Sequence, residues 1–432
     1  MLGRRIVVLC GALVSVGAAG GRARGADDGP LHIEAAVELA VSRNERARIS
    51  DYGVVAASAA VEKARTAFLP LAQAIGSDQQ HAYGSTARLP NNVRQFSVTL
   101  NQPLVNASAY SLYAQAEALL DAQRAQNVDD KRVLGFNAAS AFLAVLTAND
   151  IVRAAERQFA NAQANLADTQ GRVDAGLTSS NDVTRAQVDL AGAAREVELD
   201  KGAYENTLVQ LEFVINAQVS ASLSPPTATL AAAERELDPV DRLARFALDR
   251  RPDLAASRHS ARAAHRFAEE PLMRLVPTVG LQGQEATTSN SASTGLWHDE
   301  SLTGTVTWTL YDSGARYADK HARDAQASIG DLAVQQLERN IDSQVRGAVA
   351  LLVSAQSGYR AADQAAVAAR KNAEESAILY RQGLAKAIEL VDANDSLFAA
   401  EVSDTNAQYA MAQAYLNLRQ AMGLDALGTE LR

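Results

Sequence analysis

The side chains best suited to catalysis or metal binding are scattered along this chain. Six histidines occur, and no two of them are four residues apart, the spacing that lets one face of a helix hold a metal ion. The chain contains no His-Glu-x-x-His, Gly-x-Ser-x-Gly or Walker-type Gly-Lys-Ser/Thr motif. We therefore expect a protein that is not an enzyme, with no cofactor and no nucleotide site of its own. The histidines are His32, His81, His259, His265, His298 and His321.

The tripeptide His298-Asp299-Glu300 is the densest group of possible cation ligands. It falls in a segment that we predict to be a strand hairpin, where a solvated strand end or loop explains it better than a cation site. The single cysteine, Cys10, lies in an apolar stretch near the N-terminus. Without Cys10 the chain has no thiol, which excludes disulfides and cysteine-based metal sites.

Residues 1–25 have the pattern of a secretory signal peptide. Arg4 and Arg5 give the positive start, an apolar stretch follows, and Ala23-Arg24-Gly25 forms a small-x-small cleavage site. The net charge of the chain is −9 at pH 7. An acidic chain binds nucleic acid poorly because phosphate contact relies on clustered Lys and Arg, so we expect no nucleic-acid partner.

Several short sequence patterns occur twice along the chain. Gly176-Leu177-x3-Asn181-Asp182-Val183 recurs as Gly383-Leu384-x3-Ile388-Glu389-Leu390, an offset of 207 residues (383 − 176 = 207). Leu69-Pro70 recurs as Val276-Pro277 at the same offset. Landmarks at one constant offset predict a duplicated structural unit. We place the first repeat at residues 26–235 and the second at 236–432.

Most of each repeat is alanine-rich and free of proline, with apolar residues at heptad spacing. Examples are Leu112 with Leu119, and Val345 with Leu352. This pattern predicts long amphipathic helices packed as coiled coils.

Each repeat also contains a stretch that alternates between apolar and polar residues, as a strand does. Ser301–Leu310 places Leu302, Val306, Trp308 and Leu310 on one face and threonines on the other, after a partner strand at Thr278–Gly283. Phe96, Val98 and Leu100 alternate in the same way, after a weaker strand within Leu71–Tyr83. The two predicted hairpins cover about 71–104 and about 277–311.

Strands of roughly ten residues fit an outer-membrane barrel, whose tilted strands need about 9–11 residues. Both tryptophans, Trp297 and Trp308, fall in this region, as an interfacial aromatic belt would favour. Four strands cannot close a barrel alone, and lipid does not tolerate an open sheet edge. Either three chains pool about 12 strands, or the hairpins are soluble and dock on the helices.

These features together resemble the TolC-like outer-membrane efflux proteins, the outer-membrane factors of tripartite export systems, from about Leu31 to Leu424. Arg251-Pro252-Asp253-Leu254 is similar to the motif that opens the second repeat of that family, and Gln102-Pro103-Leu104 to the end of its second strand. The resemblance implies a mainly α fold with a small β part. A homotrimer would form a long coiled-coil α-helical barrel and a shared 12-stranded β-barrel, with two structural repeats per chain.

The resemblance also implies functional positions. Gly176-Leu177 and Gly383-Leu384 look like kinks at mid-duct. The residues expected at the periplasmic tips, in contact with an adaptor protein, are Leu146, Thr147, Ala148, Asn149 and Asp150, and Ser354, Ala355, Gln356 and Ser357. The acidic residues expected to ring the entrance are Asp363, Glu374 and Glu375.

The function that follows is a passive exit duct in the outer membrane of a Gram-negative bacterium, extending into the periplasm and in contact with outer-membrane lipid. It would export small molecules, be gated at its periplasmic tip by the adaptor, and be powered by a proton-driven or ABC-type pump of the inner membrane. One alternative is the outer-membrane channel of a type I polypeptide secretion system. Another is a periplasmic coiled-coil scaffold without a pore.

Overall fold

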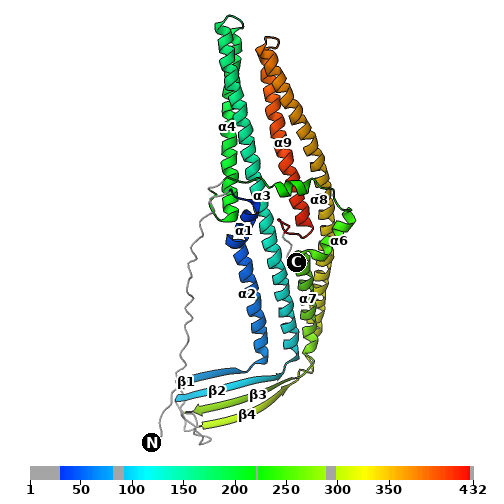
Figure 1. The fold of residues 1–432 in the computed structure, drawn as a ribbon. Helices are drawn as coiled ribbons and strands as arrows, with labels where there is room; N and C mark the ends of the chain where they lie inside the picture. Colours follow the sequence, from blue (N-terminus) through cyan, green and yellow to red (C-terminus); the bar gives the residue numbers. More distant parts are fainter. Residues whose placement is uncertain (1–29, 81–91, 220–221, 289–297, 429–432) are drawn as a thin grey trace.

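The computed structural model describes residues 30–80, 92–219, 222–288 and 298–428. They form one elongated molecule, with the strands at one end and long helices reaching to the other (Figure 1). The predicted signal peptide over residues 1–25, Tyr83 and Trp297 lie outside the described residues.

The two halves of the chain contain the same elements in the same order. Helix α1 and helix α6 begin 207 residues apart, at Ile33 and Val240, and α4 and α9 keep this offset, at Ser180 and Ala387. The predicted boundary between residues 235 and 236 falls between α5 (Thr227–Ala233) and α6. The first half comprises α1 (Ile33–Arg43), α2 (Glu45–Arg65), a 3₁₀ turn (Thr66–Phe68), β1 (Leu71–Gln80), β2 (Asn92–Val105), α3 (Ala107–Asp174) and α4 (Ser180–Ile215). The second comprises α6 (Val240–Arg250), α7 (Pro252–Met273), β3 (Thr278–Thr288), β4 (His298–Thr307), α8 (Ala315–Arg381) and α9 (Ala387–Ala421).

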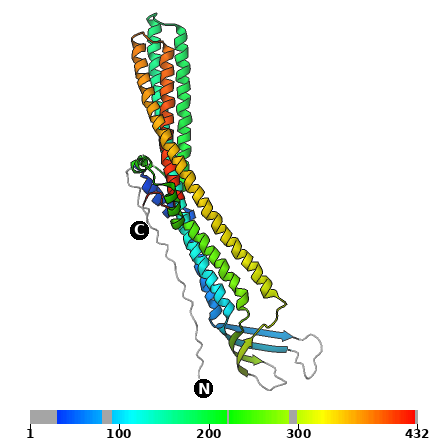
Figure 2. The ribbon, with the colours of Figure 1, turned by 90° about the vertical axis from the view of Figure 1, so that its right-hand side faces the viewer.

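Helices α3 and α8 run through almost the whole length of the molecule (Figures 1 and 2). They contain 68 and 67 residues, which at 1.5 Å per residue gives about 100 Å each. Neither contains an internal proline or a run of β-branched residues, and both are rich in alanine, the strongest helix former. The prediction of long packed helices is confirmed. Among the described residues, α3 is the one helix that is long and apolar enough to cross a membrane, and 44% of its most apolar 18-residue window is buried inside the protein.

The shorter helices pair with these two long ones at different ends. Helices α2 and α7 pack beside the sheet-proximal halves of α3 and α8, and α4 and α9 return along their distal halves (Figures 1 and 2). In the proximal half the packing order is α2-α3-α7-α8, which matches the strand order β1-β2-β3-β4. The strands therefore lie in the same order as the helices to which they connect: α2 leads into β1, β2 into α3, α7 into β3, and β4 into α8.

The four strands form one antiparallel sheet, and both predicted hairpins are confirmed. Leu71 pairs with Asn101, Gln95 with Thr288, and Thr278 with Thr307. One boundary is wrong, because β4 ends at Thr307 and not at Leu310. Beyond Thr307 the chain leaves the sheet, and the indole N–H of Trp308 donates to the carbonyl of Leu275 instead of a strand partner (3.1 Å).

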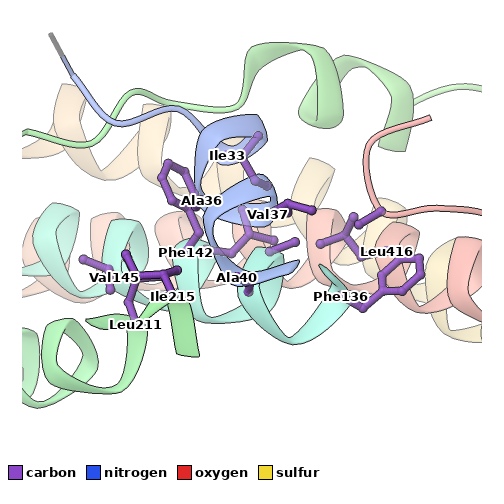
Figure 3. Close-up of a cluster of buried hydrophobic side chains, with 14 of the residues drawn as sticks. Ile33, Ala36, Val37, Ala40, Phe136, Phe142, Val145, Leu211, Ile215 and Leu416 are labelled. Atoms are coloured by element: carbon purple, nitrogen blue, oxygen red, sulfur yellow. The ribbon is translucent and has the colours of Figure 1, made fainter. Parts of the chain in front are cut away.

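The largest hydrophobic core lies at mid-length, where α1 packs against α3, α4 and α9 (Figure 3). Ile33 and Val37 of α1 meet Phe142 of α3 and Leu211 of α4 there, and all four are buried. Small alanines on the facing helices allow the close approach. They include Ala36, Ala40, Ala138, Ala139 and Ala412, each essentially without solvent exposure.

The structure contradicts the predicted positions of the periplasmic tips. Leu146, which is 2% exposed, belongs to the mid-length core inside α3, and the Thr147 hydroxyl donates to the carbonyl of Leu143 in the same helix. The second predicted tip lies inside α8, where the Gln356 amide donates to the carbonyls of Ala233 and Arg235. Both helices continue through these positions, which contain no proline, and α8 remains helical even at Gly358. All nine predicted tip residues lie in helix interiors, namely Leu146, Thr147, Ala148, Asn149 and Asp150 in α3, and Ser354, Ala355, Gln356 and Ser357 in α8.

Candidate functional site: the distal turns and the sheet

The distal ends of α3 and α8 are turns of identical construction. The N–H of Leu177 donates to the carbonyl of Arg172 (2.8 Å), and that of Gly176 to the carbonyl of Val173 (2.9 Å). This pair of bonds is a Schellman motif, which requires a residue with positive φ after the helix. Gly176 has φ 73° and Gly383 has φ 76°, a conformation that glycine adopts without steric cost.

A new helix begins shortly after each of these helix ends: α4 follows α3, and α9 follows α8. Ser179 caps α4 by accepting the N–H of Asn181 (3.2 Å), and Asp182 lies in the first turn, where a carboxylate is favourable. In the second repeat Glu389 occupies the first turn of α9. The Gly-Leu pairs are therefore the turns between antiparallel helices, and their interpretation as mid-duct kinks is wrong. In the first repeat, the signal that sequence reasoning missed is a C-terminal glycine followed within three residues by an N-cap serine; in the second repeat the N-cap residue is Lys386.

The two turns lie at the end of the molecule farthest from the sheet (Figure 1), and each has an exposed leucine. Leu177 is 77% exposed and Leu384 is 73% exposed. They occupy equivalent positions of the two repeats, directly after the positive-φ glycines. Each distal turn therefore carries one exposed leucine at the equivalent position.

Just below the turns, α3 and α8 are joined by a compact contact. The Arg172 guanidinium lies over the Tyr380 ring, 4.1 Å from its centre, and donates to the Tyr380 carbonyl (2.5 Å). The Tyr380 hydroxyl lies 3.2 Å from the hydroxyl of Thr169. Thr169 and Tyr380 are buried. This contact holds the α3–α4 hairpin against the α8–α9 hairpin near their ends.

Farther from the turns, charged and amide side chains link α3 to α9. Glu401 accepts from Arg157 of α3 (2.7 Å) and from Arg370 of α8 (3.3 Å), and its side chain is 14% exposed. The Gln158 amide donates to Asp395 of α9 (3.0 Å). These contacts between the two hairpins are polar.

A cavity of about 880 Å³ lies between the two hairpins at this level. Its walls come from α3, α4, α8 and α9 and from both turns. On α4, burial and the nearby charge of Asp395 raise the pKa of the Asp189 carboxyl. The walls include Asn165, Thr169, Arg172, Leu177, Asp182, Asp189, Tyr380 and Ile388.

At the other end of the molecule, the strand register separates apolar from polar side chains. Val279 lies opposite Val306, and Leu302 lies opposite Gly283 on the same face. The other face carries pairs such as Thr278 with Thr307. The apolar face contains Phe96, Val98, Leu100, Leu281, Leu302 and Val306, all exposed in the single chain. The opposite face is mostly polar and contains Gln73, Ser97, Thr99, Asn101, Gln282, Thr303 and Thr305, with Leu71 and Ile75 of β1 as apolar exceptions.

A two-faced sheet of this kind, prolonged by paired helices in two repeats, also marks a known protein family. The sequence model described as "Outer membrane efflux protein" matches residues 37–217 and 243–424, one match in each repeat. The chain belongs to the outer membrane efflux protein family. Its location is accordingly the outer membrane, and the two matches cover most of the chain.

Similarity to individual relatives supports the same family assignment. Outer membrane protein TolC of Salmonella enteritidis is 26% identical over 389 residues, covering 84% of this chain and 77% of TolC. The Campylobacter jejuni CmeC outer membrane channel has a similar fold, with a TM-score of 0.75, 16% identity, and 90% and 85% of the two chains covered. The open state of the Neisseria gonorrhoeae MtrE channel gives a TM-score of 0.72 at 18% identity, with 92% and 90% covered. These relatives are named as membrane proteins and channels, in keeping with a protein that is not an enzyme.

The acidic residues predicted for the entrance do not all lie at one level of this efflux protein. Asp363 and Glu374 are 11 residues apart on α8, which corresponds to about 16 Å along the helix axis. Asp363 is exposed and faces Asp404 of α9, whose pKa is raised by burial and then by the charge of Asp363. Glu374 and Glu375 are exposed closer to the distal turn, with Lys371 3.8 Å from Glu375.

The tripeptide His298-Asp299-Glu300 does not converge on one point. His298 lies 3.3 Å from Glu300 and 3.5 Å from Glu285 on one face of the sheet. Asp299 points to the other face, because neighbouring strand residues alternate. Within the residues that the structure describes, no three His, Cys, Asp or Glu side chains are placed to hold a metal ion.

Proposed function

We propose that this efflux protein is a passive exit duct for small molecules, built as a homotrimer with a shared 12-stranded barrel in the outer membrane. The observation that carries the proposal is the sheet with one apolar and one polar face, joined directly to long helices. In an outer-membrane barrel the apolar face meets lipid and the polar face lines the lumen. A sheet that served only as a soluble hairpin would not need an exposed apolar face.

The edges of the sheet give the reason for a trimer. Strands β1 and β4 are the two edges, and in the described residues neither has a partner on its outer side. Unpaired backbone groups are costly in lipid, so the edges must pair with other copies. Because β1 and β4 run antiparallel to each other, β4 of one chain can pair antiparallel with β1 of the next. Three copies then close a barrel of about 12 strands, within the known range.

In this proposal the duct opens and closes at the distal turns. Leu177 and Leu384, exposed at the ends of the two hairpins, are the contact points proposed for a periplasmic adaptor, in place of the mid-helix residues predicted from sequence. Separation of the hairpins would break the contact between Arg172 and Tyr380. Energy comes from an inner-membrane pump, since the chain has no nucleotide-binding motif. Glu374 and Glu375 are proposed to face the entrance.

The test is to reconstitute the purified protein in planar bilayers and to count subunits by chemical crosslinking. Stepwise single-channel currents from a crosslinked trimer are expected. Insertion as a trimer without current would indicate a duct that is closed at rest, and variants of Arg172 should then restore current. A protein that does not insert would refute the duct and support the pore-free periplasmic scaffold.

The alternative function is polypeptide export, with the duct joined to the pump of a type I secretion system. Affinity purification of the protein from crosslinked cells, followed by identification of the attached pump, separates the two functions. Recovery of a proton-driven drug pump supports small-molecule efflux. Recovery of a type I secretion ABC transporter supports polypeptide secretion.

A further inference from the structure

The polar side chains on the walls of the cavity between the two helical hairpins are sorted by depth. Lys386 and Arg185 line it near the turns, Lys386 at the N-cap of α9 and Arg185 five residues into α4 (185 − 180 = 5). Asn165 lies nine residues before the end of α3 (174 − 165 = 9), and Asp189 nine residues after the start of α4 (189 − 180 = 9). Nine residues correspond to about 13 Å along a helix. Cations therefore lie at the turn end of the cavity, and Asn165 and Asp189 at its inner end.

Asn165 is a buried polar side chain on this wall that lacks a partner. It is 5% exposed, and its side-chain oxygen has no hydrogen-bond partner among the described residues. Buried polar atoms almost always have a partner. Because Asn165 lines the cavity, a molecule that enters the cavity can supply the missing donor.

The turn end of the cavity is suited to a negative charge. Ala387 and Ile388, in the first turn of α9, belong to its walls. The first N–H groups of a helix lack partners within it and form the positive end of the helix dipole. Lys386, the N-cap residue of this helix, makes no side-chain cap hydrogen bond, whereas Ser179 caps α4. Glu389, in the same first turn, is not one of the walls.

The charged side chains of the walls have a net charge of +1, three cations against two acids (3 − 2 = 1). They are Arg172, Arg185, Lys386, Asp182 and Asp189. Two of them are already engaged, since Arg172 is held by the ring and the carbonyl of Tyr380 and Asp182 accepts the hydroxyl of Thr178. Arg185 and Lys386 are left to meet an anion near the turns, and the charge of Asp189 keeps an anion away from the inner end.

We propose that this cavity binds a small organic carboxylate that carries a hydroxyl group at the far end of an apolar body. The carboxylate lies at the start of α9 beside Lys386 and Arg185, and the hydroxyl donates to the side-chain oxygen of Asn165. The body contacts apolar walls that include Val188 and Val391. The volume of about 880 Å³ is within the range of about 300–1,000 Å³ that is usual for small-molecule sites.

Such a ligand contacts both hairpins at once. Asn165 and Arg185 belong to the α3–α4 hairpin, and Lys386 precedes α9 of the other hairpin. A molecule that bonds to all three therefore holds the hairpins side by side. Binding itself rests on the fold alone, whereas its effect on conductance rests on the proposed function.

The test is isothermal titration calorimetry of the full-length protein in detergent, with 3-(4-hydroxyphenyl)propionate as the probe. Two analogues match its shape: 3-phenylpropionate lacks the hydroxyl, and 3-(4-hydroxyphenyl)propan-1-ol lacks the charge. Saturable binding of the probe is expected, with each analogue about threefold to tenfold weaker, as for the loss of one hydrogen bond. The N165A variant should bind the probe no more tightly than 3-phenylpropionate. Equal binding of the probe and 3-phenylpropionate by the wild type would overturn the proposal.

A second pair of variants tests the turn end of the cavity. The K386Q/R185Q double variant replaces two exposed side chains, so it should fold normally and bind the probe about fivefold more weakly. The control is R381Q, at an exposed arginine close to the same turn but outside the walls, which should bind as the wild type does. Equal weakening by R381Q and K386Q/R185Q, or no binding of the probe to the wild type, would overturn the proposal.

Bilayer recordings separate the site from the duct. The probe should reduce the open probability of the wild type and not that of K386Q/R185Q. Calorimetric binding by a protein that does not insert into bilayers would support the site and refute the duct. Single-channel currents from a protein that does not bind the probe would support the duct and refute the site.

Discussion

Arg132 and Arg251, one from each repeat, donate hydrogen bonds to consecutive carbonyl groups at the end of α9. Arg132 of α3 reaches the carbonyl of Gln420 (2.8 Å), and Arg251, just before α7, reaches that of Ala421 (3.3 Å). The last carbonyls of a helix lack partners within the helix, and a positive charge there also interacts favourably with the helix dipole. Two guanidinium groups thus fix the C-terminal end of α9 at mid-length, while its other end reaches the distal turn.

Arg251 is buried and fully engaged, so its loss should be costly. It forms an ion pair with Asp253 (2.6 Å) and donates to Gln344 (2.5 Å). We expect R251A to lower the free energy of unfolding by about 3–5 kcal/mol, because it breaks an ion pair whose arginine is buried and leaves the half-buried Asp253 without its partner. Chemical denaturation of the purified protein measures the change. The matched variant R266A, at an exposed arginine of α7, should change the free energy by less than about 1 kcal/mol.

The ion pair between Arg251 and Asp253 should make the stability of the protein depend on pH. Burial would raise the pKa of Asp253, but its hydrogen bond with Arg251 and the charge of that arginine outweigh burial and lower it. A carboxyl whose pKa is lowered by folding contributes stability above its unfolded pKa of about 3.9 and loses it as the pH falls through the folded value. Between pH 5 and pH 2, the free energy of unfolding of the D253N variant should therefore fall less than that of the wild type, as measured by acid denaturation. A curve parallel to that of the wild type would contradict this role of Asp253.

The contribution of Asp189 to stability should change with pH in the opposite direction. Its raised pKa, caused by burial and by Asp395, means that the folded state binds the proton more tightly than the unfolded state. Stability then decreases as the pH rises from the unfolded value of about 3.9 through the folded value. We expect D189N to be more stable than the wild type at pH 7, with the difference shrinking as the solution is acidified. Thermal unfolding at several pH values tests this, and a difference that grows on acidification would rule it out.

The distal turns depend on glycine. The G176A variant places a side chain at φ 73° and should destabilise the turn by about 1–2 kcal/mol. Faster hydrogen exchange at the ends of α3 and α4 is the expected readout. Gly171 lies inside α3, where an added methyl group meets no atom within 4 Å, so G171A should instead stabilise the helix by about 0.5–1 kcal/mol. Equal protection in G176A and wild type would show that the turn tolerates the substitution.

Opening of the hairpins should be controlled by Arg172 and Tyr380. R172A removes both the ring contact and the bond to the Tyr380 carbonyl, whereas Y380F removes only the hydroxyl contact with Thr169. We expect R172A to raise the open probability in bilayers more than Y380F does, since a cation over an aromatic ring is worth about 0.5–2 kcal/mol. A double variant that is no more open than R172A would show that the two residues act through one contact. Unchanged gating in all three would remove this contact from the mechanism.

The trimer is testable with disulfides, since the chain has no cysteine other than Cys10. Edge strands β1 and β4 of one chain are three strand spacings apart, about 14 Å, too far for an internal disulfide. A cysteine at Gln73 of β1, combined in turn with one at Ser301, Thr303 or Thr305 of β4, should therefore form crosslinks between chains. A ladder ending at the trimer on non-reducing gels is expected. A ladder ending at the dimer would contradict the 12-stranded barrel.

Several features of this protein follow from the sequence by itself. The 207-residue offset predicted the duplication, heptad spacing predicted the long helices, and the alternation of Leu302, Val306 and the intervening threonines predicted a two-faced strand. These signals are local, because helix and strand periodicities depend on neighbours only a few residues away. The motifs at Arg251-Pro252-Asp253-Leu254 and Gln102-Pro103-Leu104 pointed to the correct family.

The tertiary structure decided where the helices end and which side chains meet. The family resemblance places Leu146 and Thr147 at a helix end, yet both lie inside α3, where Leu146 belongs to the core beneath α1. Gly176 looks like a kink until the antiparallel packing of α4 on α3 identifies it as the turn. Asp189 and Asp395 are 206 residues apart in sequence (395 − 189 = 206), and only the packing of four helices brings their charges together. Local sequence sets the period of an element, whereas burial and charge at a site depend on partners that are distant in the chain.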